Sequence, residues 1–92
     1  LLTICSHGVG AAGALTIFEP LFHSGVKTII RAGTCGSFQE DIGTGDILIG
    51  TGSVREDGVS TDVLPIEFPA IADCRVTHAL EAAAAELDCQ PM

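Results

Sequence analysis

The stretch KTIIRAGTCGS, residues 27–37, decides the fold class of this chain. It joins a short apolar run to Arg31 and then to two glycines, Gly33 and Gly36. A short apolar run that ends in a glycine-rich turn is typical of a buried strand in an α/β sheet. Ligands of such sheets bind at the carboxyl-terminal edge of the strands, so the sequence predicts that Arg31 lies at a ligand-binding edge.

The composition agrees with an α/β layer. A length of 92 residues allows at most one domain with a small core, yet 47% of the residues are hydrophobic and the only aromatic residues are four phenylalanines. This balance favours aliphatic strands buried on both faces over a small free-standing domain. Because the chain opens inside an apolar run without an initiator methionine, we expect residues 1–92 to form one partial domain of a longer protein.

Charge and cysteine usage exclude several classes of protein. A net charge of −8 argues against nucleic acid as a partner, and the apolar runs are far shorter than the ~20 residues of a membrane-spanning helix. The cysteines show neither a C-x-x-C pair nor the spacing of a zinc site; they are Cys5, Cys35, Cys74 and Cys89. We therefore expect a cytoplasmic protein with reduced thiols and no metal site.

Alternating elements follow along the chain. Apolar runs predict three strands, at residues 1–6, 26–32 and 46–51. Helical spacing of apolar residues predicts a helix from Ala11 to a stop at Ser24-Gly25, with a kink or an early end at Pro20. A last helix is predicted over residues 70–87.

Two glycine clusters are candidate ligand sites, and the first is Gly8-Val9-Gly10-Ala11-Ala12-Gly13. It matches the G-x-G-x-x-G fingerprint of dinucleotide binding. That fingerprint also requires an acidic residue about 20 positions further on, where this chain carries Arg31. An NADP-type site tolerates a basic residue there, so a non-catalytic NADP-binding or nucleotide-binding module remains an alternative.

The second cluster runs from Arg31 to Gly36. The guanidinium, the Thr34 hydroxyl and the amides of the glycine turn can converge on one point, which describes an oxyanion site and most simply a phosphate site. The competing interpretation pairs Arg31 with a nearby carboxylate, Glu40 or Asp41, beside an ordinary turn.

Residues 31–73, RAGTCGSFQEDIGTGDILIGTGSVREDGVSTDVLPIEFPAIAD, resemble the nucleoside phosphorylase family and in particular its uridine phosphorylase branch. The motif R-x-G-T-x-G followed by Q-x-D-I-x-x-G-D carries the likeness to the superfamily. The motifs V-R-x-D-G and L-P-x-E-F-P-A-x-A-D are similar to those of the pyrimidine branch. The preceding residues 6–30 fall in the same register.

The resemblance implies a fold and an activity. The fold is α/β, a fragment of a three-layer αβα domain with a central mixed sheet. The activity is reversible phosphorolysis of a nucleoside, most simply uridine, to free base and ribose 1-phosphate, with inorganic phosphate as co-substrate and no cofactor. Purine nucleoside phosphorolysis and nucleoside hydrolysis remain alternatives. The resemblance also implies a homo-oligomer, a dimer or a hexamer, and residues 1–92 alone are expected to be inactive.

The resemblance also implies roles for individual residues. Arg31 matches the phosphate-binding arginine of the family, and Thr34 matches the threonine that contacts both phosphate and ribose. The other matched positions are Gly8 and Val9 on the ribose side and Cys35 and Gly36 in the loop beside the base. No residue is assigned as an acid or a base.

The remaining polar residues receive structural interpretations. His7, directly before the glycine turn, either approaches the ligand or is a hydrogen-bonded structural histidine. We expect Asp46 and Arg55 to order the backbone, and Asp73 to cap the last helix or lie in its first turn.

Overall fold

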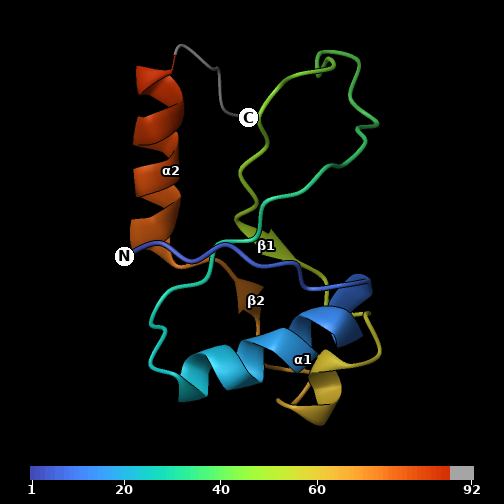
Figure 1. Ribbon diagram of the computed structural model, residues 1–92. Helices are drawn as coiled ribbons and strands as arrows, with labels where there is room; N and C mark the ends of the chain where they lie inside the picture. Colours follow the sequence, from blue (N-terminus) through green and yellow to red (C-terminus); the bar gives the residue numbers. More distant parts are fainter. Residues whose placement is uncertain (88–92) are drawn as a thin grey trace. The chain divides into compact units, whose positions relative to one another are not determined.

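The computed structural model describes residues 1–87, which form two compact units. The first unit comprises Leu1–Gly33 and Asp57–Pro65, and the second comprises Thr34–Glu56 and the chain from Ile66 onward. Regular elements follow in the order α1, β1, η1, β2 and α2 (Figure 1). Their bounds are Gly10–His23, Gly52–Ser53, Ser60–Asp62, Ala70–Ile71 and Cys74–Glu86. Neither helix has the length and apolar character needed to cross a bilayer.

Helix α1 lies in the first unit and passes through Pro20. Of the kink or early end predicted at this proline, the early end is wrong, because the helix continues to His23, and the kink stays a prediction. Its end has the geometry of a Schellman motif: Gly25 donates to the Phe22 carbonyl at 3.0 Å and Val26 donates to the Leu21 carbonyl at 3.1 Å. Gly25 has a φ of 96°, which confirms the predicted glycine stop.

The start of α1 packs closely on the segment before it. Gly8 and Gly10 have φ values of 76° and 66°, a left-handed conformation that glycine adopts without strain. A Cβ added to Gly13 would lie only 2.5 Å from the carbonyl oxygen of His7. Gly13 therefore allows the first turn of α1 to lie directly against the backbone of residues 7–8.

A carboxylate orders the turn that leads into η1. Asp57 accepts hydrogen bonds from the amides of Val59 at 2.8 Å and Ser60 at 2.6 Å, and from the Ser60 hydroxyl at 2.7 Å. The Ser60 hydroxyl, followed by the two amides, lowers the pKa of Asp57 to about 2. These bonds fix residues 57–60 as a local turn within the first unit.

The second unit contains a two-stranded antiparallel sheet. Gly52 of β1 pairs with Ile71 of β2, Ser53 pairs with Ala70, and the Ala72 amide extends the ladder to the Thr51 carbonyl at 2.9 Å. The predicted helix over residues 70–87 is therefore wrong at its start, because residues 70–71 are a strand. The helix begins four residues later.

The start of α2 is set by Asp73, which confirms the predicted cap. Its carboxylate accepts from the amides of Arg75 at 2.9 Å and Val76 at 3.2 Å. Bonds from Val76 and then Arg75 lower the pKa of Asp73 below its ordinary value. Such a cap satisfies amides that have no partner inside the helix.

The three strands predicted at residues 1–6, 26–32 and 46–51 are not strands in this structure. Residues 1–8 and 26–37 have no ladder, and within residues 46–51 only Ile47 forms an isolated bridge. An apolar run reports that a segment tends to be buried, whereas a strand also needs a hydrogen-bonded neighbour. Among the described residues, only β1 and β2 pair as the strands of a sheet.

Few side chains are buried. Among the described residues, Ala84 of α2 at 5% exposure and Arg55 at 9% are the only buried side chains. Arg55 donates from Nη1 to the Phe68 carbonyl at 2.7 Å, and Asp46 accepts from the Gly43 amide at 2.7 Å. Both bonds confirm that these two residues order the backbone.

Candidate functional site

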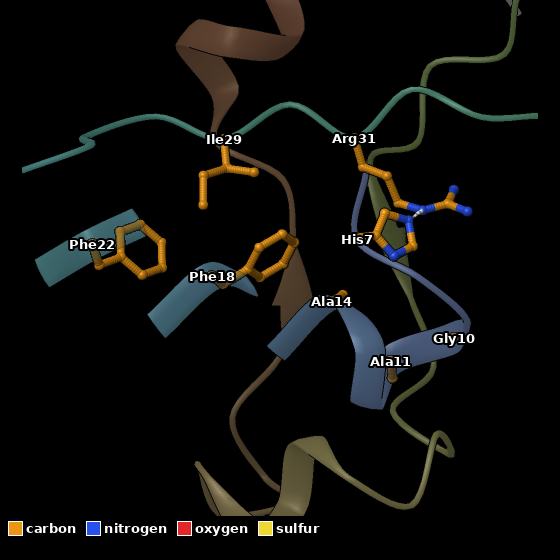
Figure 2. A pocket seen from close by; sticks show the side chains of 8 residues that line it. All are labelled: His7, Gly10, Ala11, Ala14, Phe18, Phe22, Ile29 and Arg31. Carbon is orange, nitrogen blue, oxygen red and sulfur yellow. Dashed lines mark hydrogen bonds between the residues drawn. The ribbon is translucent and has the colours of Figure 1, made fainter. Parts of the chain in front are cut away.

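Arg31 of the first unit is joined to His7 by a hydrogen bond. Nε of Arg31 donates to Nε2 of His7 across 3.2 Å (Figure 2). The two residues are 24 positions apart, and each lies just before a glycine-containing turn. The contact therefore brings together the two side chains that come shortly before Gly8 and Gly33.

The terminal nitrogens of Arg31 extend over Gly33. A Cβ added to Gly33 would lie 3.1 Å from Nη1 and 3.2 Å from Nη2, which is closer than an ordinary contact. Glycine at this position therefore makes room for the guanidinium above the backbone. Because Nε is occupied by His7, the edge formed by Nη1 and Nη2 is the one with two parallel donors, and it has no partner among residues 1–87.

His7 is held in one tautomer by this contact. A neutral imidazole has one donor and one acceptor nitrogen, so a ring that accepts at Nε2 carries its proton on Nδ1. Nδ1 is buried and has no hydrogen-bond partner among the described residues. The bond to Arg31 is therefore the only hydrogen bond of the His7 ring among the described residues.

Beside this pair lies an open pocket of about 480 Å³. One side is apolar, made by Phe18 and Phe22 of α1 and by Ile29, and the other side carries His7 and Arg31 (Figure 2). The remaining lining residues, all near the start of α1, are Gly10, Ala11 and Ala14. The pocket thus combines an apolar wall with one cationic end.

The residues matched to the ribose side lie next to this pair in the chain. Gly8 follows His7 directly and has the left-handed conformation described above, and Val9 is the exposed N-cap of α1. Thr34, Cys35 and Gly36 belong to the second unit, and all three are exposed. Their convergence on Arg31 stays a prediction.

The competing interpretation pairs Arg31 with Glu40 or Asp41, which belong to the second unit, so it stays a prediction. Among the described residues, ion pairs join His23 to Glu19 and Arg75 to Asp73. Of the four cysteines, Cys5, Cys35 and Cys74 are free and exposed, whereas Cys89 lies outside the described residues.

The pairing of His7 with Arg31 is the feature that sequence reasoning did not identify. The sequence indicates that His7 is either a ligand neighbour or a hydrogen-bonded residue, but it does not identify a partner for the ring. The sequence offers only a partial signal, because each side chain follows an apolar run and precedes a glycine turn but neither pattern identifies the other residue as its partner.

The arrangement is suited to an anion. A guanidinium edge with two parallel donors matches the spacing of two oxygens of a phosphate or a carboxylate. The partner at Nε is a neutral ring, so the positive charge of Arg31 is not cancelled. An anion that binds there gains both the charge and the two donors.

Comparisons with known proteins place the chain in a family. A model of the phosphorylase superfamily matches residues 1–91. A uridine phosphorylase from Klebsiella aerogenes is 48% identical over 81 residues, which cover 88% of this chain and 32% of that protein. A purine nucleoside phosphorylase from Plasmodium falciparum is 50% identical over 84 residues, which cover 90% of this chain and 34% of that protein.

A guanosine phosphorylase from Halorubrum lacusprofundi is 40% identical over 87 residues, which cover 95% of this chain and 36% of that protein. The chain thus spans about a third of the length of the curated relatives it matches. The match of the superfamily model covers almost all of the chain. The chain therefore belongs to the phosphorylase superfamily, which confirms the resemblance to nucleoside phosphorylases drawn from its sequence.

Proposed function

We propose that the protein containing this chain catalyses the reversible phosphorolysis of a nucleoside, with Arg31 and Thr34 holding the phosphate. The observation that carries this proposal is the state of the Arg31 guanidinium. It is anchored at Nε by a neutral ring, and its Nη1 and Nη2 edge has no partner among residues 1–87. The names of the relatives, which include uridine and purine nucleoside phosphorylases, support the same reaction.

The chemistry follows from charge. As the glycosidic bond lengthens, the sugar gains positive character, and a phosphate held close to the anomeric carbon stabilises that charge. Holding the phosphate also converts a random encounter into an oriented attack. Arg31 and Thr34 therefore act by positioning and electrostatics, and Gly8 and Val9 border the ribose while Cys35 and Gly36 border the base.

Uridine is the first candidate substrate, because the motifs within residues 54–73 resemble the pyrimidine branch. Purine nucleosides are the second candidate, since the Plasmodium relative with 50% identity is named a purine nucleoside phosphorylase. We further propose a three-layer αβα fold and a homo-oligomer for the full-length protein, as the family resemblance implies. Light scattering of the purified protein measures the oligomer count.

The deciding experiment follows the ultraviolet absorbance of uridine, and separately of inosine, with the full-length protein in the presence and absence of inorganic phosphate. We expect loss of uridine only when phosphate is present. Turnover of inosine alone would assign the purine candidate, and cleavage without phosphate would assign hydrolysis. No turnover of either nucleoside, together with tight binding of NADP, would replace the proposal with a binding module.

A further inference from the structure

We propose that His7 is a positioning residue for the phosphate site: it holds the Arg31 guanidinium by Nε and directs the Nη1 and Nη2 edge toward the phosphate. This inference rests on the proposed function, because it assumes that Arg31 binds phosphate. Its basis is the 3.2 Å hydrogen bond from Arg31 Nε to His7 Nε2.

The geometry gives the bond an orienting role. A guanidinium is planar, so a bond at Nε fixes the direction of the two terminal nitrogens. Those nitrogens lie over Gly33, where even a Cβ would be 3.1 Å from Nη1. The glycine backbone and the imidazole thus restrict the orientation of the guanidinium plane. The arginine is therefore already oriented before phosphate binds.

The chemistry explains why a neutral ring is suited to this role. A carboxylate at Nε would also orient arginine, but it would cancel the positive charge and compete with the phosphate for the guanidinium. Neutral histidine accepts a hydrogen bond without adding negative charge. A protonated ring has no acceptor nitrogen, so the contact exists only with neutral His7.

His7 is half-buried, and its Nδ1 atom is inaccessible to solvent. Nδ1 is also unpartnered among the described residues, so Arg31 provides the hydrogen bond that orients the ring. The backbone of His7 is fixed as well, because its carbonyl oxygen lies against Gly13 of α1. An anchored acceptor restricts the arginine more than a mobile one, and less entropy is lost when phosphate binds.

The test uses the full-length protein with three variants. His7→Gln keeps an acceptor at about the reach of Nε2, His7→Phe keeps a ring without an acceptor, and His23→Phe is the control at an exposed histidine of α1. We measure KM for phosphate, KM for the nucleoside, and crystal structures of each variant without ligand. For His7→Phe we expect about a tenfold rise in KM for phosphate, with KM for the nucleoside unchanged. His7→Gln is expected to restore most of the affinity.

Several outcomes would overturn the inference. An unchanged KM for phosphate in His7→Phe, or an Arg31 side chain that keeps its orientation in the crystal structure of that variant, contradicts positioning. Equal losses in His7→Gln and His7→Phe, or a matching rise in KM for the nucleoside, indicate a merely structural role.

The same variants separate this inference from the proposed function. If the wild-type protein cleaves no nucleoside, the proposed reaction fails and calorimetry with inorganic phosphate decides the inference. Phosphate affinity that falls in His7→Phe and is retained in His7→Gln supports positioning. Absence of phosphate binding by the wild type overturns it.

Discussion

Arg31 retains an uncancelled positive charge because its protein partner is a neutral imidazole. The sequence predicted a phosphate site at Arg31 from the order of the arginine and the glycine turn alone. It could not predict the partner at Nε, since that contact joins residues 24 positions apart and depends on how two segments meet in space. The residue roles assigned from the motif stay predictions, whereas the pairing of Arg31 with His7 is seen only in the structure.

Removal of the guanidinium is the most direct test of the role of Arg31. In the full-length protein, Arg31→Ala is expected to lower kcat/KM for phosphorolysis by about 10²–10³-fold, the effect of deleting a group that stabilises developing charge. Arg31→Lys is expected to recover little, because an ammonium lacks the fork of two parallel donors. Steady-state kinetics with varied phosphate measure both.

The control for these variants is Arg75→Ala, which removes an exposed arginine of α2 whose ion pair with Asp73 is long, at 3.5 Å. It is expected to retain wild-type kinetics. Unchanged phosphate affinity in Arg31→Ala would remove Arg31 from the site.

The variant Gly33→Ala tests whether the guanidinium of Arg31 needs the space that glycine leaves beneath it. The Cβ of Gly33→Ala would meet Nη1 at 3.1 Å and Nη2 at 3.2 Å, so the flexible end of Arg31 must move by a few tenths of an ångström. We expect a raised KM for phosphate, smaller in effect than Arg31→Ala, with little change in Tm. Gly50→Ala is the matched control, since a Cβ there meets nothing within 4 Å. Equal kinetics in the two glycine variants would show that the space over Gly33 is not limiting.

At the scale of elements, the helices were predicted better than the strands. Local signals set the ends of both helices: the left-handed Gly25 stops α1, and the Asp73 carboxylate starts α2. Such signals act within a few residues, so a sequence displays them completely. Strand formation in segments 1–6, 26–32 and 46–51 depends on distant partners, and the apolar pattern contains no information about where those partners are.

The cap of α2 has a measurable effect on stability. In the full-length protein, Asp73→Ala is expected to lower Tm by a few degrees, because the amides of Arg75 and Val76 lose their acceptor. Glu81→Ala, at an exposed position of the same helix, is the control and is expected to leave Tm nearly unchanged.

The pKa of Asp73 sets the pH dependence of that effect. Its pKa is lowered in the folded protein, first by the Val76 amide and then by Arg75, so the stabilisation is complete above the unfolded pKa and is lost as the pH falls through the lower folded value. The Tm difference between wild type and Asp73→Ala is therefore expected to shrink on acidification below about pH 4. A difference that grows in acid would contradict the assignment.

At the scale of the whole molecule, the burial of apolar side chains is low. Ala84 is the only hydrophobic residue buried among those described, while many large apolar side chains are exposed, including Leu1, Leu2, Ile4, Phe38 and Ile71. A protein needs extensive apolar burial to offset the conformational entropy of folding. The partial-domain interpretation of residues 1–92 stays a prediction.

This burial predicts the behaviour of residues 1–92 as an isolated chain. We expect a gradual urea transition without cooperativity, strong binding of a dye that reports exposed apolar surface, and no nucleoside turnover. The full-length protein, measured in parallel, is expected to unfold cooperatively and to bind little dye. A sharp transition of the isolated chain would show that its own contacts suffice for a stable fold.

The pairing of β1 with β2 has a consequence for the order in which the chain folds. Gly52 and Ile71 are partners, so the ladder closes the intervening loop, whereas α2 and the Asp57 turn form from contacts only two to four residues apart. Closing a loop costs entropy before its hydrogen bonds are gained, so the local elements form first and the ladder forms late. During synthesis on the ribosome, β1 stays unpaired until Ile71 has emerged. Any delay in that interval leaves the unpaired backbone of β1 exposed to other chains.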